Sequence, residues 1–183
     1  MTTTLLAEKV AVLCVSRNSI YNQFDNVDVF DIDRDARTFD GLSPIIAHPP
    51  CRAWSAFCRH QAKPGPGEKR LGLWCCEQLK KNGGVLEQPA FSRLFHAGGL
   101  PPRGVFKGDL FTIEVNQSWW GYPMIKKTWL CFSRIDPHEI QLPPQSPPPP
   151  GSRRTQQKMS KHQRAATCRE FAEFLIKAAS KAK

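Results

Sequence analysis

The stretch Ile45-Ile46-Ala47-His48-Pro49-Pro50-Cys51-Arg52-Ala53-Trp54-Ser55 joins a short apolar run to two prolines and a cysteine. The apolar run predicts a short buried strand, and the two prolines end regular structure and hold the chain in a stiff extended turn. In open α/β sheets, ligand crevices lie at the carboxyl ends of the strands. We therefore expect Cys51 at such an edge, placed as a nucleophile; a buried, inert cysteine beside a rigid turn is the alternative.

Composition and charge narrow the class of protein. With 183 residues and 40% hydrophobic content, the chain can bury one core, so a single domain is expected. The formal net charge is +10, and after Gly151 there are nine Lys or Arg against two Glu. This concentration of positive charge favours a nucleic acid as partner, with a solvated basic tail as the alternative.

The cysteines and the first residues indicate a compartment. The seven cysteines are an odd number at irregular spacing, and the chain starts without the positive and apolar regions of a signal peptide. No apolar run reaches the ~20 residues that span a bilayer. Reduced thiols in a cytoplasm, with no membrane contact, are therefore expected.

The hydrophobic pattern predicts both helices and strands. Apolar residues at helical spacing predict a helix over 68–82 that a Gly-Gly pair ends, and a short helix is expected through Tyr21 and Phe24. Another helical apolar face begins at residue 168, after a capping box with Thr167 as N-cap. Short apolar and β-branched runs predict strands at 9–15, 27–32, 44–47, 85–86, 110–115 and 128–132.

This order of elements predicts an α/β sheet. Six prolines within residues 142–151 predict an extended connector. The last helix presents one apolar face, so we expect it to dock on the body of the protein. The expected division is an α/β domain over residues 1–142, a proline-rich and basic connector over 143–160, and a C-terminal helix over 161–183 that packs on the same domain.

Further segments carry side chains with candidate chemistry, in a fixed order along the chain. Glu87 follows a short apolar strand and stands two residues before Pro89. The segment Trp120-Gly121-Tyr122-Pro123 precedes the basic pair Lys126-Lys127 and another strand. A carboxylate beside a turn is often only an exposed surface group. A functional role for Glu87 is therefore inferred only from its position in the chain together with the cysteine loop and the other segments.

Taken together, these segments resemble the DNA cytosine-5 methyltransferases. Residues 49–55 are similar to the family's Pro-Cys loop, residues 85–89 to its Glu-Asn-Val segment, and residues 121–128 to its Gly-x-Pro-Gln-x-Arg-x-Arg segment. The last helix falls where the family's own returns to the cofactor, and the whole is similar to small phage and prophage proteins. The resemblance implies a truncated, methyltransferase-like (Rossmann-like) sheet with helices on both faces, in the cytoplasm of a bacterial host.

The resemblance also implies a role for each group. Cys51 adds to carbon 6 of a cytosine and Glu87 bonds ring nitrogen N3, so that carbon 5 can attack the methyl group of S-adenosylmethionine. Lys126 or Lys127 stands in for the family's arginines, without their bidentate hydrogen bonding. The cofactor contacts would be Ser16, Asn18, Asp31, Asp33 and Pro49. The DNA contacts would be Arg52, Trp54, Ser55, Trp120, Tyr122, Arg153, Arg154, Lys158 and Lys161.

Two departures from the family bear on function. The loop Cys14-Val15-Ser16-Arg17-Asn18-Ser19, after the first predicted strand, has none of the glycines that let the family's backbone approach the cofactor. The interval between Lys127 and the last helix is too short for the family's target-recognition domain. The chain would then act on a single-stranded or flipped base, on a free nucleotide, or with a protein partner that supplies recognition.

Three functions are open at this stage. The first is modification of a pyrimidine in DNA through a cysteine adduct, most simply 5-methylation of cytosine. The others are transfer of a non-methyl group, and a non-catalytic nucleic-acid-binding or decoy protein that kept the fold and lost the cofactor. A zinc site is not expected, because the cysteines lack metal-ligand spacing and the zinc deaminase pattern is absent. The tryptophans could stack on bases, although burial in the core is their commoner role.

Overall fold

The computed structural model describes residues 9–55, 63–147, 150, 159–160, 163 and 165–183. Along the chain, the α-helices and strands are β1 (Val10–Leu13), β2 (Val27–Phe30), β3 (Ile45–Ala47), α1 (Glu68–Asn82), β4 (Gly84–Pro89), α2 (Leu94–Ala97), β5 (Phe106–Lys107), β6 (Leu110–Asn116), β7 (Lys127–Ser133) and α5 (Arg169–Ala179). Short 3-10 helices lie between them: η1 (Ile20–Gln23), η2 (Ala36–Thr38), η3 (Cys51–Ala53), η4 (Gln117–Trp120) and η5 (Pro137–Glu139).

All the strands form one seven-stranded mixed sheet in the order β2-β1-β3-β4-β7-β6-β5. Strands β1 to β4 are parallel, whereas β7, β6 and β5 join by antiparallel pairing. Strand β2 lies on one side of β1 and strand β3 on the other, so the direction in which the chain adds strands to the sheet reverses at β1. Because Leu13 pairs with Ala47 and Ala47 with Leu86, the carboxyl ends of β1, β3 and β4 lie level with one another. Open α/β sheets bind their ligands at such an edge.

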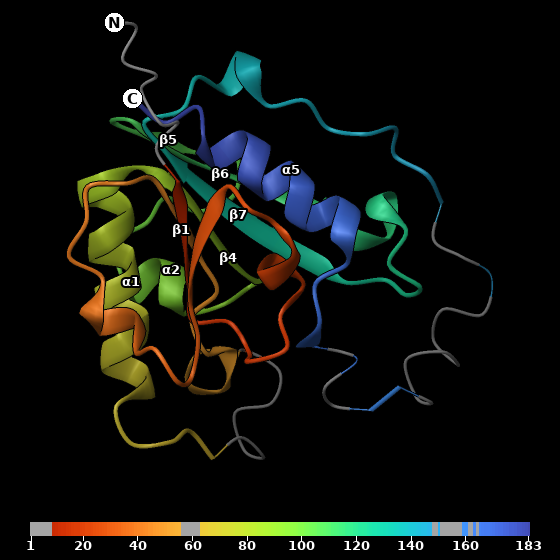
Figure 1. The fold of residues 1–183 in the computed structure, drawn as a ribbon. Coiled ribbons are helices and arrows are strands. Elements are labelled where there is room, and N and C mark those ends of the chain that lie inside the picture. Colours follow the sequence, from red (N-terminus) through yellow and green to blue (C-terminus); the bar gives the residue numbers. More distant parts are fainter. Residues whose placement is uncertain (1–8, 56–62, 148–149, 151–158, 161–162, 164) are drawn as a thin grey trace, which may run out of the picture.

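Helices cover both faces of the sheet (Figure 1), as expected for the α/β class. Helices α1 and α2 pack on one face, and α5 packs on the other. Alternate residues of each strand point to opposite faces, so neighbouring strand residues belong to different core layers. The α1 layer includes Leu13, Ala47, Cys75, Leu79, Leu86 and Leu94. The α5 layer includes Val12, Ile46, Val85, Leu130, Phe171 and Leu175.

Local chemistry explains most of the element boundaries. Helix α1 occupies the predicted residues 68–82 and ends where Gly83 adopts a φ of 74° and donates its N–H to Leu79. At the start of β4, a Cβ on Gly84 would lie 2.0 Å from the carbonyl oxygen of Ile45, so only glycine allows β4 to approach β3 here. The close approach at Gly84 therefore helps to set the register between β3 and β4.

The two smaller helical predictions have different outcomes. The expected turn near Tyr21 is the 3-10 helix η1, which Ser19 caps by accepting the N–H of Tyr21. The last helix has the predicted apolar face, but its N-cap is Cys168 and no side chain caps it. The predicted capping box with Thr167 is therefore wrong. The sequence pattern did not predict α2 and β5, which are too short to show a period.

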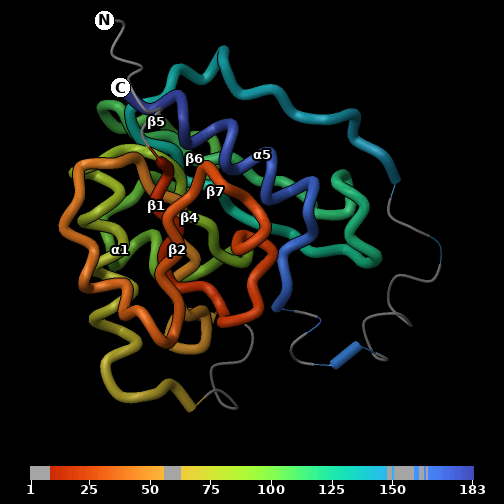
Figure 2. The backbone as a smooth tube through the Cα atoms, in the orientation of Figure 1, coloured from red at the N-terminus to blue at the C-terminus, as the bar shows by residue number. Residues whose placement is uncertain are grey.

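The segment that follows β7 runs along the outer side of α5 (Figure 2). Two lysines of the C-terminal part hold it there: Lys181 donates to the carbonyl of Glu139 at 2.6 Å, and Lys177 donates to Gln141 at 3.4 Å. Residues 139–143 and α5 border a pocket of about 330 Å³. Within the described residues, no helix has the length and apolarity that crossing a membrane requires.

Candidate active site

The Pro-Pro-Cys turn is fixed at the carboxyl edge of the sheet. His48, directly after β3, donates its N–H to the carbonyl of Leu13 at 3.0 Å and so extends the pairing with β1. Buried Gln88 donates its side-chain amide to the carbonyl of Pro49, and Ser92 donates to the Gln88 oxygen at 3.1 Å. Cys51 then begins η3 and is exposed. Cys51 is thus exposed in a loop whose backbone is hydrogen-bonded to Gln88 of β4.

The far end of the same loop is tied to helix α1. Arg52 forms an ion pair with Glu68 in the first turn of α1. The Trp54 ring lies against Gly72, where a Cβ would come within 2.4 Å of the indole nitrogen. The carbonyl of Trp54 accepts the N–H of Arg93 at 3.0 Å. Both ends of the cysteine loop therefore have fixed partners.

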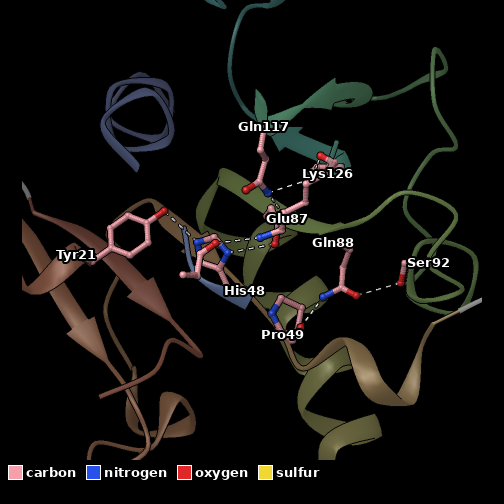
Figure 3. A network of polar contacts seen from close by, with 10 residues as sticks. Tyr21, His48, Pro49, Glu87, Gln88, Ser92, Gln117 and Lys126 are labelled. Atoms are coloured by element: carbon pink, nitrogen blue, oxygen red, sulfur yellow. Dashed lines mark hydrogen bonds and ion pairs between the residues drawn. The ribbon is translucent and has the colours of Figure 1, made fainter. Parts of the chain in front are cut away.

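Glu87 lies on the neighbouring strand β4 and faces the α5 side of the sheet. Its carboxylate is 12% exposed and has a partner on each oxygen: Oε2 is 3.3 Å from His48 Nδ1, and Oε1 accepts from Gln117 at 3.2 Å. The Gln117 amide also lies 3.0 Å from the hydroxyl of Thr128. Behind His48, the hydroxyl of Tyr21 lies 3.0 Å from Nε2. Figure 3 shows Tyr21, His48, Glu87 and Gln117 converging from separate segments of the chain.

The carboxylate of Glu87 is held in its ionised form. Burial alone would raise its pKa, but the hydrogen bond from His48, the charge of Lys126 and the Thr128 hydroxyl together hold the pKa below its usual value. At neutral pH Glu87 is therefore an acceptor with a full negative charge.

Cys51 and Lys126 belong to the same electrostatic cluster. The pKa of the Cys51 thiol is raised, first because the surrounding protein desolvates the thiolate and then because Glu87 is negative; the charges of Lys126 and Arg52 oppose this rise. Burial lowers the pKa of Lys126, while Glu87, Cys168 and Cys51 oppose that change. The thiol, the carboxylate and the ammonium group therefore influence one another's pKa. Cys51 rests as a thiol at neutral pH.

The structure separates the two candidate lysines. Lys126 donates to the carbonyl of Ala166 at 3.1 Å and lies 4.9 Å above the Tyr122 ring. Lys127 lies one residue further along, and its ammonium group is 3.8 Å from Glu114 in the middle of β6. The structure thus brings Lys126 close enough to Glu87 to influence its pKa, whereas Lys127 pairs with Glu114.

Three rings that were expected to contact nucleic acid are buried instead. Trp54 and Trp120 are 8% exposed and Tyr122 is 3% exposed. Trp120 packs on Phe171 and Phe174 of α5, with ring centroids 4.9 and 4.8 Å apart. Base stacking by these three rings is thus excluded in this conformation, because the core already covers their faces. Arg52 is exposed and Ser55 is half-buried, whereas Arg153, Arg154, Lys158 and Lys161 lie outside the described residues.

The groups expected to hold S-adenosylmethionine are engaged with one another. Arg17 donates two hydrogen bonds of 2.6 Å to the carboxylate of Asp33, which lowers the pKa of Asp33. Asp31 accepts the N–H groups of Asp33 and Arg34 at 2.8 and 3.1 Å. Ser16 and Asn18 are exposed, and Pro49 is buried with its carbonyl held by Gln88. In this conformation the carboxylates of Asp31 and Asp33 already have partners within the protein.

Four residues of the site did not stand out as functional in the sequence: Tyr21, His48, Gln88 and Gln117. His48 lies inside the stretch that decides the fold, directly before the two prolines, and this position is the one local signal that could have marked it. The other three come from elements distant in sequence, so only the fold shows that they meet. In the described part of the chain, no three His, Cys, Asp or Glu side chains are grouped to hold a metal ion.

Comparison with protein-family models, with curated proteins and with solved structures found no significant match. The resemblance to the cytosine-5 methyltransferases therefore depends on the motifs and on where the fold puts them. The pocket between residues 139–143 and α5 is lined by neither Cys51 nor Glu87, so it is separate from this chemistry.

Proposed function

We propose that this protein modifies a pyrimidine base of DNA through a covalent adduct with Cys51, most simply for 5-methylation of cytosine. One observation carries the proposal. An exposed cysteine directly after β3 and a largely buried glutamate on β4 belong to adjacent parallel strands at the carboxyl edge of an α/β sheet. Catalytic groups are expected at this edge.

The chemistry of such an adduct uses both groups. Cys51 gives its proton to solvent and forms a bond from Sγ to carbon 6 of the ring, and the electrons of the 5,6 double bond move to carbon 5 and N3. N3 takes up a proton from solvent, and Glu87 accepts hydrogen bonds from this N–H and from the 4-amino group. Lys126 opposes the rise in the Cys51 pKa and so favours the thiolate. Carbon 5 then bonds to an electrophile, which releases its leaving group. The protons on carbon 5 and N3 return to solvent, the electrons of the carbon 5–hydrogen bond re-form the 5,6 double bond, and the bond to sulfur breaks to give the thiolate.

S-adenosylmethionine would supply the electrophilic methyl group in the simplest form of this reaction. The ion pair between Arg17 and Asp33 must open before Asp33 can bind a ribose. Transfer of another group from a different donor uses the same adduct. We propose DNA as the partner, with the base in a single strand or extruded from a duplex, and with a second protein that supplies target recognition. The setting we propose, from the resemblance, is the cytoplasm of a bacterial cell, with a phage origin.

The adduct is tested by DNA that contains 5-azacytosine. The extra ring nitrogen makes carbon 6 electrophilic enough to bond a thiolate without any donor. We expect the wild-type protein to form a covalent complex, visible by denaturing electrophoresis and intact mass, and Cys51→Ala to form none. Cys168→Ala is the matched control, because Cys168 is a second partly exposed cysteine near Lys126. A wild-type protein that forms no complex would refute the proposed function.

Methyl transfer is tested separately by DNA that contains 5-fluorocytosine with S-adenosylmethionine present. Fluorine at carbon 5 cannot leave as a cation, so a stable complex forms only after a group has been transferred to carbon 5. A complex with 5-azacytosine DNA but none with 5-fluorocytosine DNA would show that the adduct forms and that methyl transfer does not follow it.

A second candidate function is favoured by one observation, the ion pair between Arg17 and Asp33 where the cofactor was expected. A nucleic-acid-binding protein that kept the fold and lost catalysis would bind no cofactor, so this ion pair would not have to open. Its signature is DNA binding by both the wild type and Cys51→Ala, no covalent complex with either probe, and no heat on titration with S-adenosylmethionine.

A further inference from the structure

His48 occupies the centre of a chain of three polar side chains under the candidate site. Its backbone is fixed by the bond to Leu13, and its ring is largely buried, with 12% of the side chain exposed. The ring of Tyr21 packs against it with centroids 5.5 Å apart. One ring nitrogen faces Tyr21 and the other faces Glu87. Neither Tyr21 nor His48 takes part directly in the proposed adduct chemistry.

The positions of the protons in this chain follow from the groups that face the two ring nitrogens. An ionised carboxylate only accepts hydrogen bonds, so Nδ1 of His48, 3.3 Å from Oε2 of Glu87, carries a proton and donates it. In the neutral imidazole Nε2 is then an acceptor, and the Tyr21 hydroxyl 3.0 Å away donates to it. Tyr21 is fully buried, and this burial raises its pKa, so the hydroxyl keeps the proton that it donates. Donation by Tyr21 thus holds the imidazole in the tautomer that Glu87 needs.

We infer that His48, with its tautomer set by Tyr21, is a positioning residue that fixes the Glu87 carboxylate as an acceptor facing the base. This inference rests on the proposed function. Gln117 holds the other oxygen, so the carboxylate is fixed against rotation from two sides. Each oxygen keeps one further lone-pair direction for a ligand.

Loss of the His48 donor has a definite electrostatic consequence. Glu87 is buried, so a carboxylate deprived of this hydrogen bond takes up a proton more readily. The ionisable groups that surround Glu87 are Tyr21 and His48 behind it, Lys126 beside β7, and Cys51 from η3. The pKa of the Glu87 carboxyl should therefore rise when the His48 donor is removed.

The first test compares two substitutions in the adduct assay with 5-azacytosine DNA. His48→Asn keeps a side-chain N–H near the position of Nδ1, whereas His48→Leu removes it. We expect His48→Leu to slow adduct formation on the order of 10- to 100-fold, with DNA affinity unchanged. His48→Asn should retain most of the rate, and Tyr21→Phe should fall between the two. Equal rates for His48→Leu and the wild type would overturn the inference.

The second test does not depend on DNA chemistry and therefore separates this inference from the proposed function. The pKa of the Glu87 carboxyl is measured by NMR titration of the free protein, with Glu87→Gln to assign its signal. We expect His48→Leu to raise this pKa, because the hydrogen bond from His48 helps to lower it, and His48→Asn to match the wild type. If the wild type forms no adduct but this rise appears, the proposed function fails and the positioning role stands. A Glu87 pKa in His48→Leu that matches the wild type, or one in His48→Asn that matches His48→Leu, would contradict the positioning role.

Discussion

The carboxyl edge of the sheet has two parts that treat polar residues differently. At the ends of β1 and β2, Arg17 and Asp33 form an exposed ion pair between neighbouring loops, and Arg34 of the second loop pairs with Asp28 on β2. At the ends of β3 and β4, Glu87 is buried and bonded from two sides. Both parts lie at the strand ends where ligands bind in this fold class.

The difference indicates which part is built for chemistry. Exposed ion pairs gain little from their partners and lose little when they are removed. A buried carboxylate is costly unless its partners satisfy it, so an arrangement that keeps one beside an exposed thiol needs a reason. Binding of a pyrimidine ring at the β3–β4 part would explain why Glu87 is kept there. At the β1–β2 part, the charged side chains are already paired with one another.

The largest effect is expected from Glu87→Gln. This substitution removes the charge that stabilises the adduct, so adduct formation with 5-azacytosine DNA should fall on the order of 100-fold or more. The same change removes a negative charge that raises the pKa of Cys51, so alkylation by iodoacetamide should become faster at neutral pH. Glu114→Gln is the matched control, because Glu114 is a partly buried carboxylate outside the site. Loss of both reactivities in Glu87→Gln would point to misfolding and contradict the assigned role.

A smaller effect is expected from Lys126→Met. The charge of Lys126 lowers the pKa of Cys51, so its removal should raise that pKa further and move the alkylation profile to higher pH. Adduct formation at neutral pH should slow about tenfold, the effect of one pKa unit on the thiolate fraction. Lys127→Met is the control one residue away, and its profile should match the wild type. If the two variants behave alike, the separation of the two lysines by the strand is of no functional importance.

Gln88→Ala tests the support below the cysteine loop. It removes the donor to the Pro49 carbonyl and a partner of Ser92. We expect a loss of about 1–3 kcal/mol in the free energy of unfolding, measured by urea denaturation, because buried groups lose their hydrogen bonds. Adduct formation should slow by several fold, with the pH profile of Cys51 unchanged. A shift of that profile would mean that the loop acts on charge rather than on position.

The smallest effect is expected from Arg17→Ala in the other part of the edge. Its ion pair with Asp33 is exposed, so the melting temperature should remain that of the wild type. Adduct formation with 5-azacytosine DNA should also be unchanged, since no donor takes part. A slower adduct rate in Arg17→Ala would break the comparison, because it would couple the two parts.

Local sequence predicted much of the fold and the two central residues. The helix at 68–82 was predictable from its apolar spacing and its glycine stop, and the observed bounds of α1 confirm this prediction. Cys51 and Glu87 could be placed at one edge because each follows an apolar run, and parallel strands bring such positions together. The alternation of a strand could also have separated Lys126 from Lys127, once the start of β7 was known.

The remaining features depend on contacts between distant segments. Trp54 and Trp120 look like candidate stacking rings in the sequence, but α1 and α5 bury them. The hydrogen bond from Gln117 to Glu87 joins residues from β4 and the β6–β7 connection. The pairing of Arg17 with Asp33 depends on the loops after β1 and β2 lying side by side. No pattern within either loop predicts it.

A crystal structure of the protein trapped on DNA that contains 5-azacytosine tests the central claim most directly. The account predicts a bond between Cys51 Sγ and carbon 6 of the base, with a Glu87 oxygen within hydrogen-bonding distance of N3 and His48 still bonded to the other side of that carboxylate. A base bound elsewhere, or a ring whose N3 faces away from Glu87, would contradict it.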